Sequence, residues 1–347
     1  MAESRRLYLV AAVLAVICLC IAALGVVGPG LMRLLRGSPA STPDFDATLQ
    51  ALIAETIVPG EAATPLATAT TQPGNGEPSG KIVYTCKDMS GQNICIMNAD
   101  GSGLHRLTPL DGYARYYASL APDGESVVYS QYREANVYEI YEMAIATGVA
   151  VRLTDRLGVS NSPEISPDGK SIVFMRDPGA SDQYQIWLMN RDGSNQRRLF
   201  SGRGWDPTWS PDGSQILFAS DMDGTVQLYR IDLDGSNPKR ISDLPAIRGR
   251  SDWSSQGMIA TYSGQPWKRE VYIMRADGSE ARRVSPPGGN SQGPSFSPDG
   301  DWLAFTSYFD KNGDDLGCEI YIIRVDGTDL RRLTNNDFCD YQPRWGP

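Results

Sequence analysis

Histidine is nearly absent from this chain: its 347 residues include a single one, His105. A Ser-His-Asp triad, a Cys-His pair or a His-rich metal centre would have to use this residue or do without histidine. His105 stands beside Arg106 in a segment that we expect to be an exposed edge strand. The sequence therefore predicts a protein that is not an enzyme and that needs no cofactor.

Basic charge is also scarce, because 32 Lys and Arg residues face 41 Asp and Glu residues and leave a net charge of −9. This balance excludes a nucleic-acid partner, since binding to phosphates requires clustered positive charge. The paired basic residues that do occur, such as Arg282-Arg283 and Arg331-Arg332, are interpreted instead as guards that keep strand edges from pairing with other chains.

A long apolar run occurs once, where residues 7–27 form 21 consecutive uncharged, mostly apolar positions. About 20 such residues span a bilayer as a helix. A cleaved signal peptide is the alternative, because Ala23-Leu24-Gly25 offers small residues, but its apolar region usually runs about 7 to 15 residues. We expect a transmembrane signal-anchor helix at 7–27, with residues 1–6 as a short cytoplasmic tail.

The next segment, 28–80, is expected to be an extracytoplasmic linker. From Ser38 onwards it is rich in Ala, Thr, Pro, Ser and Gly, and residues 58–80 contain no aromatic and no basic residue. Such a segment cannot bury enough apolar surface to offset its chain entropy. The sequence predicts a disordered tether.

Residues 81–347 are a repeat. The turn Ser166-Pro167-Asp168-Gly169 returns at 210–213 and 297–300, with variants at 121–124 and 254–257, and its glycines are spaced 45, 44, 44 and 43 residues apart. A second mark, Asp-Gly-Ser or Asp-Gly-Thr, lies between these turns and is followed by a basic residue, an apolar residue and Thr or Ser, as in Arg332-Leu333-Thr334. A period of about 40 to 50 residues with four short strand signals is typical of propeller blades.

The repeat thus predicts an all-β fold, a six-bladed β-propeller of four-stranded blades. The ends of the chain support an interleaved closure, because residues 343–347 repeat the pattern of residues 207–211. We expect the last residues to form the innermost strand of the blade whose second strand is 81–84. This arrangement joins the ends of the ring by backbone hydrogen bonds and leaves no open seam.

With its Ser-Pro-Asp-Gly turns, Ile-Tyr-x-Met strands and Asp-Gly-Ser and Arg-Leu-Thr marks, the chain resembles the TolB-like, WD-like β-propeller repeat family over residues 81–347. Full TolB proteins are periplasmic, carry an α/β domain before the propeller and bind other envelope proteins. That α/β domain has no counterpart among the residues before the repeat. The resemblance implies the propeller fold and a binding role, because the shared residues are turns and core.

Four cysteines of the repeat map to one face, formed by the loops that join second to third strands and blade to blade. Disulfides Cys86 to Cys95 and Cys318 to Cys339 fit this placement, whereas Cys86 to Cys339 and free buried thiols are the alternatives. An even number of cysteines near the closure of the ring indicates an oxidising, extracytoplasmic compartment.

The same loop face is where a propeller usually presents a ligand, on residues that enter the innermost strands. Counting back from each turn gives the candidate binding residues, which are Tyr116, Tyr117, Asn161, Trp205, Asp206, Arg250, Tyr341 and Gln342. Aromatic rings mixed with Asp206 and Arg250 suit a protein loop, a peptide or a glycan. Asp310, Asn312 and Asp314 carry oxygen ligands at alternate positions and are a calcium candidate, but a polar hairpin loop explains them as well.

Taken together, these residues predict a membrane-anchored, extracytoplasmic and monomeric propeller that binds an envelope or extracellular protein, a peptide or a glycan without catalysis. One alternative is a propeller glycosidase, lyase or lactonase that uses Asp206, Asp252 and Asp340 with a divalent ion. Another alternative is a structural element of an envelope assembly.

Overall fold

The computed structural model describes residues 76–155, 158–179, 182–309 and 317–347. Within these ranges all regular structure is β-strand, in agreement with the predicted all-β class. The tail, the expected anchor helix 7–27 and the linker up to residue 75 lie outside the described residues. The ranges that are described contain no helix long and apolar enough to cross a membrane.

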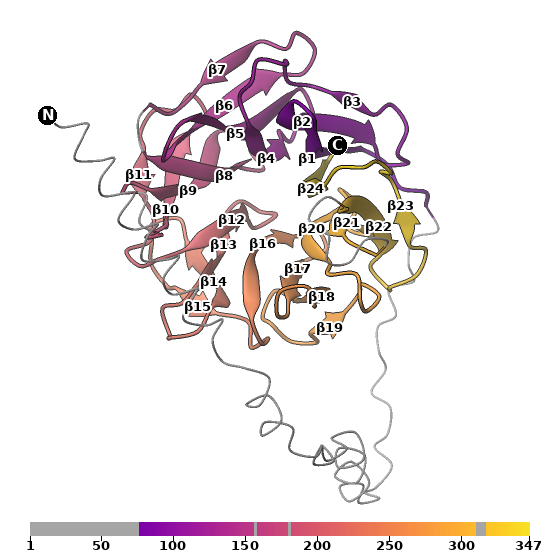
Figure 1. Ribbon diagram of the computed structural model, residues 1–347. Helices are drawn as coiled ribbons and strands as arrows, with labels where there is room; N and C mark the ends of the chain where they lie inside the picture. Colours follow the sequence, from indigo (N-terminus) through magenta and orange to yellow (C-terminus); the bar gives the residue numbers. More distant parts are fainter. Residues whose placement is uncertain (1–75, 156–157, 180–181, 310–316) are drawn as a thin grey trace, which may run out of the picture. The chain divides into compact units, whose positions relative to one another are not determined.

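The strands form four sheets of four strands and one sheet of eight. The four-stranded sheets have the orders β24-β1-β2-β3, β12-β13-β14-β15, β16-β17-β18-β19 and β20-β21-β22-β23. The eight-stranded sheet consists of two antiparallel groups, β4 to β7 and β8 to β11, which a single parallel pair joins between Tyr138 and Val159. Figure 1 shows these groups arranged in a ring.

In each group three further strands follow the innermost strand outward. The residue ranges of the strands are given below in that order. In the first sheet they are β24 Asp340–Gly346, β1 Lys81–Asp88, β2 Gly91–Asn98 and β3 His105–Arg106. The eight-stranded sheet has β4 Arg115–Leu120, β5 Ser126–Glu134, β6 Val137–Ala144, β7 Ala150–Arg152, β8 Val159–Ile165, β9 Ser171–Asp177, β10 Gln185–Asn190 and β11 Arg197–Arg198. The next has β12 Trp205–Trp209, β13 Gln215–Ser220, β14 Gln227–Asp232 and β15 Lys239–Arg240. The last two have β16 Ile247–Trp253, β17 Met258–Ser263, β18 Glu270–Arg275, β19 Arg282–Arg283, β20 Gln292–Phe296, β21 Trp302–Ser307, β22 Glu319–Arg324 and β23 Arg331–Arg332.

The Ser-Pro-Asp-Gly turns reverse the chain between first and second strands. In one of them the Ser166 hydroxyl donates to the Asp168 carboxylate (2.6 Å) and accepts from the backbone N–H of Ser171 (2.9 Å). Gly169 ends the turn at φ +72°, in the left-handed region that glycine adopts without steric cost. The Ser, Asp and Gly of this motif are therefore required by the turn itself.

The Arg-Leu-Thr marks fasten the outer strands. The hydroxyl at the third position accepts a hydrogen bond from a backbone N–H of the third strand 14 residues earlier, as for Ile320 N–H and Thr334 Oγ1 at 2.9 Å. The same bond joins Ile94 to Thr108, Ile140 to Thr154, Leu228 to Ser242 and Val271 to Ser285. The basic residue at the first position of the mark lies on the outer strand. His105 of β3 is exposed there too, as the sequence predicts.

The hydrophobic core lies between neighbouring sheets. One cluster, for example, combines Ile82 and Met97 of the first sheet with Trp302 and Ile320 of the last, and Trp345 of β24 joins it. Both faces of each inner strand are thereby covered, which explains the near-continuous apolar runs of the second and third strands.

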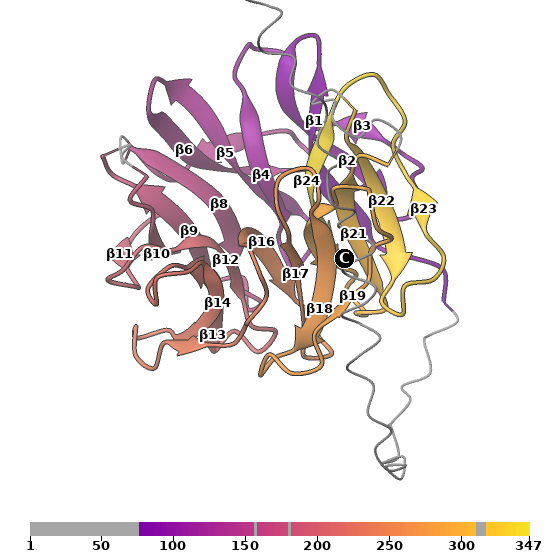
Figure 2. The same ribbon diagram turned by 60° about the horizontal axis from the view of Figure 1, so that its bottom comes forward.

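The predicted interleaved closure is present. β24 pairs antiparallel with β1, with Ile82 opposite Trp345 and Cys86 opposite Asp340. The yellow strand β24 lies beside the indigo strand β1 in Figure 1 and again in the turned view of Figure 2. The last strand of the chain is thus the innermost strand of the first sheet.

Two disulfides lie at this closure, and both predicted pairings are confirmed. Cys86–Cys95 joins β1 to β2, and Cys318–Cys339 joins the residues that precede β22 and β24. The alternative pair of Cys86 with Cys339 is not formed. The two bridges adjoin, because Cys86 is opposite Asp340 in the β1–β24 pairing, and Asp340 follows Cys339 in the chain.

Candidate functional site

A ring of backbone irregularities surrounds the mouth of the central channel on the loop face. Each innermost strand carries one residue with a left-handed backbone near the point where it enters the sheet, with φ between +46° and +58°. These residues are Tyr117, Ser162, Asp206, Arg250, Gly293 and Gln342. Register shifts accompany all six of them. Such bulges redirect a side chain relative to the strand, and non-glycine residues adopt them at an energetic cost.

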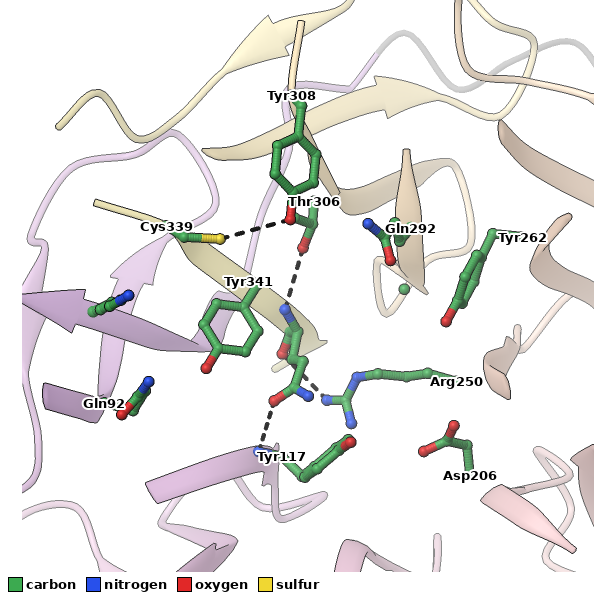
Figure 3. A pocket seen from close by; sticks show the side chains of 13 residues that line it. Gln92, Tyr117, Asp206, Arg250, Tyr262, Gln292, Thr306, Tyr308, Cys339 and Tyr341 are labelled. Carbon is green, nitrogen blue, oxygen red and sulfur yellow. Dashed lines mark hydrogen bonds between the residues drawn. The ribbon is translucent and has the colours of Figure 1, made fainter. Parts of the chain in front are cut away.

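A cavity of about 330 Å³ opens at this ring (Figure 3). Five predicted binding residues line it, namely Tyr117, Asp206, Arg250, Tyr341 and Gln342. The lining also includes residues that the sequence reasoning missed, among them Lys87, Gln92, Tyr262, Thr306, Tyr308 and Cys339. Strand pairing could have identified some of them. Thr306 of the second strand is opposite Gln292, which lies at the start of the first strand and also lines the cavity.

Three predicted residues do not line this cavity. Trp205 packs against the core clusters on both sides of its sheet, and Tyr116 lies against Tyr138 with ring centroids 6.0 Å apart. Asn161 is buried and is opposite Met175 in the β8–β9 pairing. Each of the three directly precedes a left-handed residue and turns away from the cavity, whereas Tyr341, which precedes the left-handed Gln342, lines it.

Arg250 gives the cavity a buried positive charge. Its side chain is 6% exposed, and one guanidinium nitrogen, Nη2, donates to the carbonyl oxygens of Ala118 (3.3 Å) and Gln342 (3.2 Å). The guanidinium carbon lies 5.3 Å from the centre of the Tyr117 ring, and Nε has no hydrogen-bond partner in the part of the chain that is described. Burial lowers the pKa of Arg250 to about 10, so the group remains a cation at neutral pH.

Asp206 provides the opposite charge beside it. One carboxylate oxygen, Oδ1, accepts a hydrogen bond of 2.7 Å from the Ser162 hydroxyl. Gly249 allows this placement, because a Cβ at that position would collide with the Asp206 carboxylate. The mouth of the channel therefore presents a cation, an anion and several tyrosine rings, which suits recognition of a polar segment with aromatic or charged groups.

A second set of charged residues lies deeper in the channel. The Arg344 guanidinium contacts the carboxylates of Glu164 (3.3 Å) and Asp252 (3.5 Å). Asp252 also accepts hydrogen bonds from the Ser295 hydroxyl (2.9 Å) and the backbone N–H of Phe296 (2.7 Å). Burial raises the pKa of Glu164 above its usual range. The two Arg344 contacts join blades that are not adjacent, and the Asp252 hydrogen bonds reach the next blade, so this set stabilises the ring.

The three carboxylates considered for a catalytic alternative are therefore separated. Asp206 lines the cavity, Asp252 belongs to the deeper set, and Asp340 is 1% exposed beside the disulfides. Asp310, Asn312 and Asp314 lie outside the described residues. Elsewhere in the propeller, among residues that are described, no three His, Cys, Asp or Glu side chains come close enough to hold a metal ion.

Asp340 should make the stability of the propeller depend on pH. Burial raises its pKa to about 7, although the Asn336 amide donates to it (2.7 Å). Because the unfolded carboxyl ionises near its ordinary value, the folded state holds more protons above about pH 4, and stability falls as the pH rises towards 7. We expect Asp340→Asn to flatten this part of a plot of melting temperature against pH. An unchanged slope in the variant would assign the dependence to other groups.

Exposed apolar side chains gather on the same loop face. Six of the ten large hydrophobic residues that are exposed lie in its loops or strand ends: Met89, Leu110, Tyr113, Tyr132, Met222 and Trp267. Trp267 connects this rim to the cavity, because its ring meets that of Tyr308 edge to face at 5.3 Å. Exposed apolar groups around a polar cavity are typical of a surface that binds another protein.

Comparisons with known proteins agree with this architecture. The family model of the TolB beta propeller domain matches residues 178–269. An uncharacterized protein of Agrobacterium fabrum is 31% identical over 206 residues, which cover 56% of this chain and 55% of that protein. The Tol-Pal system protein TolB of Francisella tularensis is 29% identical over 42% of this chain, and the match covers 34% of its length. The chain thus matches between a third and about half of the length of these relatives.

Among solved structures, the crystal structure of TolB from Acinetobacter baumannii superposes with a TM-score of 0.69. The sequences are 22% identical, and the superposition covers 78% of this chain and 68% of the other. A likeness at this identity concerns the fold.

Proposed function

Since the described domain is a TolB-like β-propeller, we propose that the chain is a non-enzymatic binding module of the cell envelope, with six blades, whose loop face recognises a protein partner. In this proposal residues 7–27 anchor the chain in the membrane and the propeller lies on the extracytoplasmic side. The two disulfides support an oxidising compartment.

The observation that carries the proposal is that the loop face combines a polar cavity with a surrounding rim of exposed apolar side chains. A polar cavity with the buried Arg250 cation lies inside a rim of exposed apolar side chains that includes Met222 and Trp267. Interfaces between proteins commonly combine aromatic, Met and Arg anchors in this way, and a few such residues supply most of the binding energy. The TolB relative is named for the Tol-Pal system, which supports a partner of the envelope.

The test uses the full chain as bait for membrane extract from its source organism, followed by binding measurements with each purified candidate partner. Trp267→Ser and Met222→Ser together should weaken the affinity at least tenfold, because truncating an anchor of a protein interface costs about 2 kcal/mol or more. Both side chains are exposed, at 37% and 40%, so the fold should tolerate the change.

The matched control is Leu104→Ser with Leu330→Ser, two side chains of similar exposure (49% and 40%) outside the loop face. Their variant should bind as the parent does. Equal binding by both double variants would reject the loop face as the recognition surface, and an equal loss in both would point to a general effect on solubility.

A further inference from the structure

One outer strand differs from all others that are described. In each group one residue of the outer strand is paired with the third-from-last residue of the third strand. On five outer strands this residue is basic: His105, Arg197, Lys239, Arg282 and Arg331. In β7 the equivalent residue, opposite Glu142, is Val151. Basic side chains on an edge discourage pairing with other chains, and β7 lacks this protection at its centre.

The contacts between blades are reversed at the same place. On two other outer strands the basic residue reaches a carbonyl in the next blade: Arg197 donates to Leu233 O (2.6 Å) and Arg282 to Val325 O (2.7 Å). Each of these carbonyl residues directly precedes an Asp-Gly turn. The residue at this position in the blade after β7 is Arg191, which instead reaches back to Glu142 (2.7 Å) and Asp123 (3.6 Å).

The reversal leaves a groove of about 800 Å³ beside β7. Its floor is apolar, with Val149, Val151 and Leu153, which alternate along the strand and so share one face. Val149 and Val151 are 63% and 58% exposed. The groove is also lined by acidic residues, which are Asp123, Glu125, Glu142 and Asp192 and outnumber its one cation, Arg191.

The backbone of β7 is available on its outer side. Val149 O and Leu153 N–H bond inward to β6, to Ala144 N–H (3.0 Å) and Ile140 O (2.8 Å). Backbone groups alternate in direction along an antiparallel strand, so those of Ala150 and Arg152 point away from β6. An extended peptide could pair with these groups and place alternate side chains over the valines.

We propose that the β7 edge binds an extended segment of another protein, which adds to the sheet as a strand whose alternate side chains face the groove and combine an apolar residue with flanking Lys or Arg. Addition of a strand supplies affinity through backbone hydrogen bonds, while the side-chain positions supply specificity. The acidic lining favours a basic segment. A second copy of this chain fits less well. If two copies paired through β7 about a twofold axis, their acidic grooves would meet and repel each other. If β7 paired instead with a basic outer strand of the second copy, that strand would offer only two residues.

The test uses the full chain and a seven-residue peptide, capped at both ends, in which the side chains of one face are Lys, Val and Lys and the other positions are Thr, with a peptide that carries Glu in place of Lys for comparison. Val151→Arg, which installs the residue type found on the other outer strands, should weaken binding of the Lys peptide at least tenfold. Leu330→Arg adds the same charge on another blade and should leave the affinity unchanged. Hydrogen exchange should slow at residues 149–153 when the Lys peptide binds.

Each other outcome overturns the proposal. Equal weakening by Val151→Arg and Leu330→Arg would show attraction to the net negative charge alone. Equal binding of the Glu peptide would exclude the acidic lining as a determinant. Concentration-dependent dimerisation of the parent that Val151→Arg abolishes would assign the edge to a second copy. None of these measurements involves the loop face, so they are independent of the proposed function.

Discussion

Trp345→Ala is expected to lower the free energy of unfolding by about 3 to 5 kcal/mol, the usual cost of truncating a buried aromatic side chain to alanine. Trp345 is 8% exposed, belongs to the core between the first and last sheets, and donates from its indole nitrogen to Ser79 O (2.8 Å). It lies on the strand that closes the ring. For a domain of this size the change corresponds to a fall of about 10 °C in melting temperature, measurable by circular dichroism.

Trp209 is the matched control, since it occupies the equivalent place on β12, is 4% exposed and donates to Glu164 O (3.0 Å). Trp209→Ala should cost a similar free energy but act elsewhere. Hydrogen exchange should accelerate in β1 and β24 for Trp345→Ala and in β12 and β13 for Trp209→Ala. Unchanged protection of β1 in the Trp345 variant would contradict the role of this residue in closure.

Replacing Cys318 and Cys339 together by serine is expected to destabilise the propeller by about 3 kcal/mol. The bridge closes a sequence separation of 21 residues, and in the chain-entropy model it restricts the unfolded state. Both residues are buried, and the bridge connects the residue before β22 to the residue before the closing strand β24. Chemical denaturation of the oxidised parent and of the double variant measures the difference.

The second bridge offers a comparison. Cys86–Cys95 spans 9 residues and joins two strands that are already paired along their length. Its double serine variant should lose less free energy, because the shorter loop contributes less entropy. Reduction of the parent should cost more free energy than either double variant, and the loss should depart from the sum of the two because the adjoining bridges are coupled. Identical melting curves for reduced and oxidised parent would contradict both expectations.

The site could be predicted from the sequence only in part. The turn spacing placed Asp206 and Arg250 at the mouth of the channel, and the cavity includes them. The spacing could not show that Asp206 lines the cavity and the neighbouring Trp205 does not, because the bulge at Asp206 decides which of the two side chains enters the channel. Tyr262 and Tyr308 were missed since they come from second strands and their loops, which a count from the turns does not reach.

The sequence by itself determined the all-β repeat and the pairing of the last strand with the first sheet; it offered the two disulfides beside the alternatives of Cys86–Cys339 and free thiols, and the structure decided between them. The repeat and the strand pairing depend on local turns and on a period of about 44 residues, both of which are written along the chain. Only the tertiary structure decided the composition of the cavity, the deeper set around Arg344 and the unguarded edge of β7. Their contacts join residues of different blades, such as Arg344 with Glu164 and Arg191 with Glu142, and no local pattern encodes which of them meet.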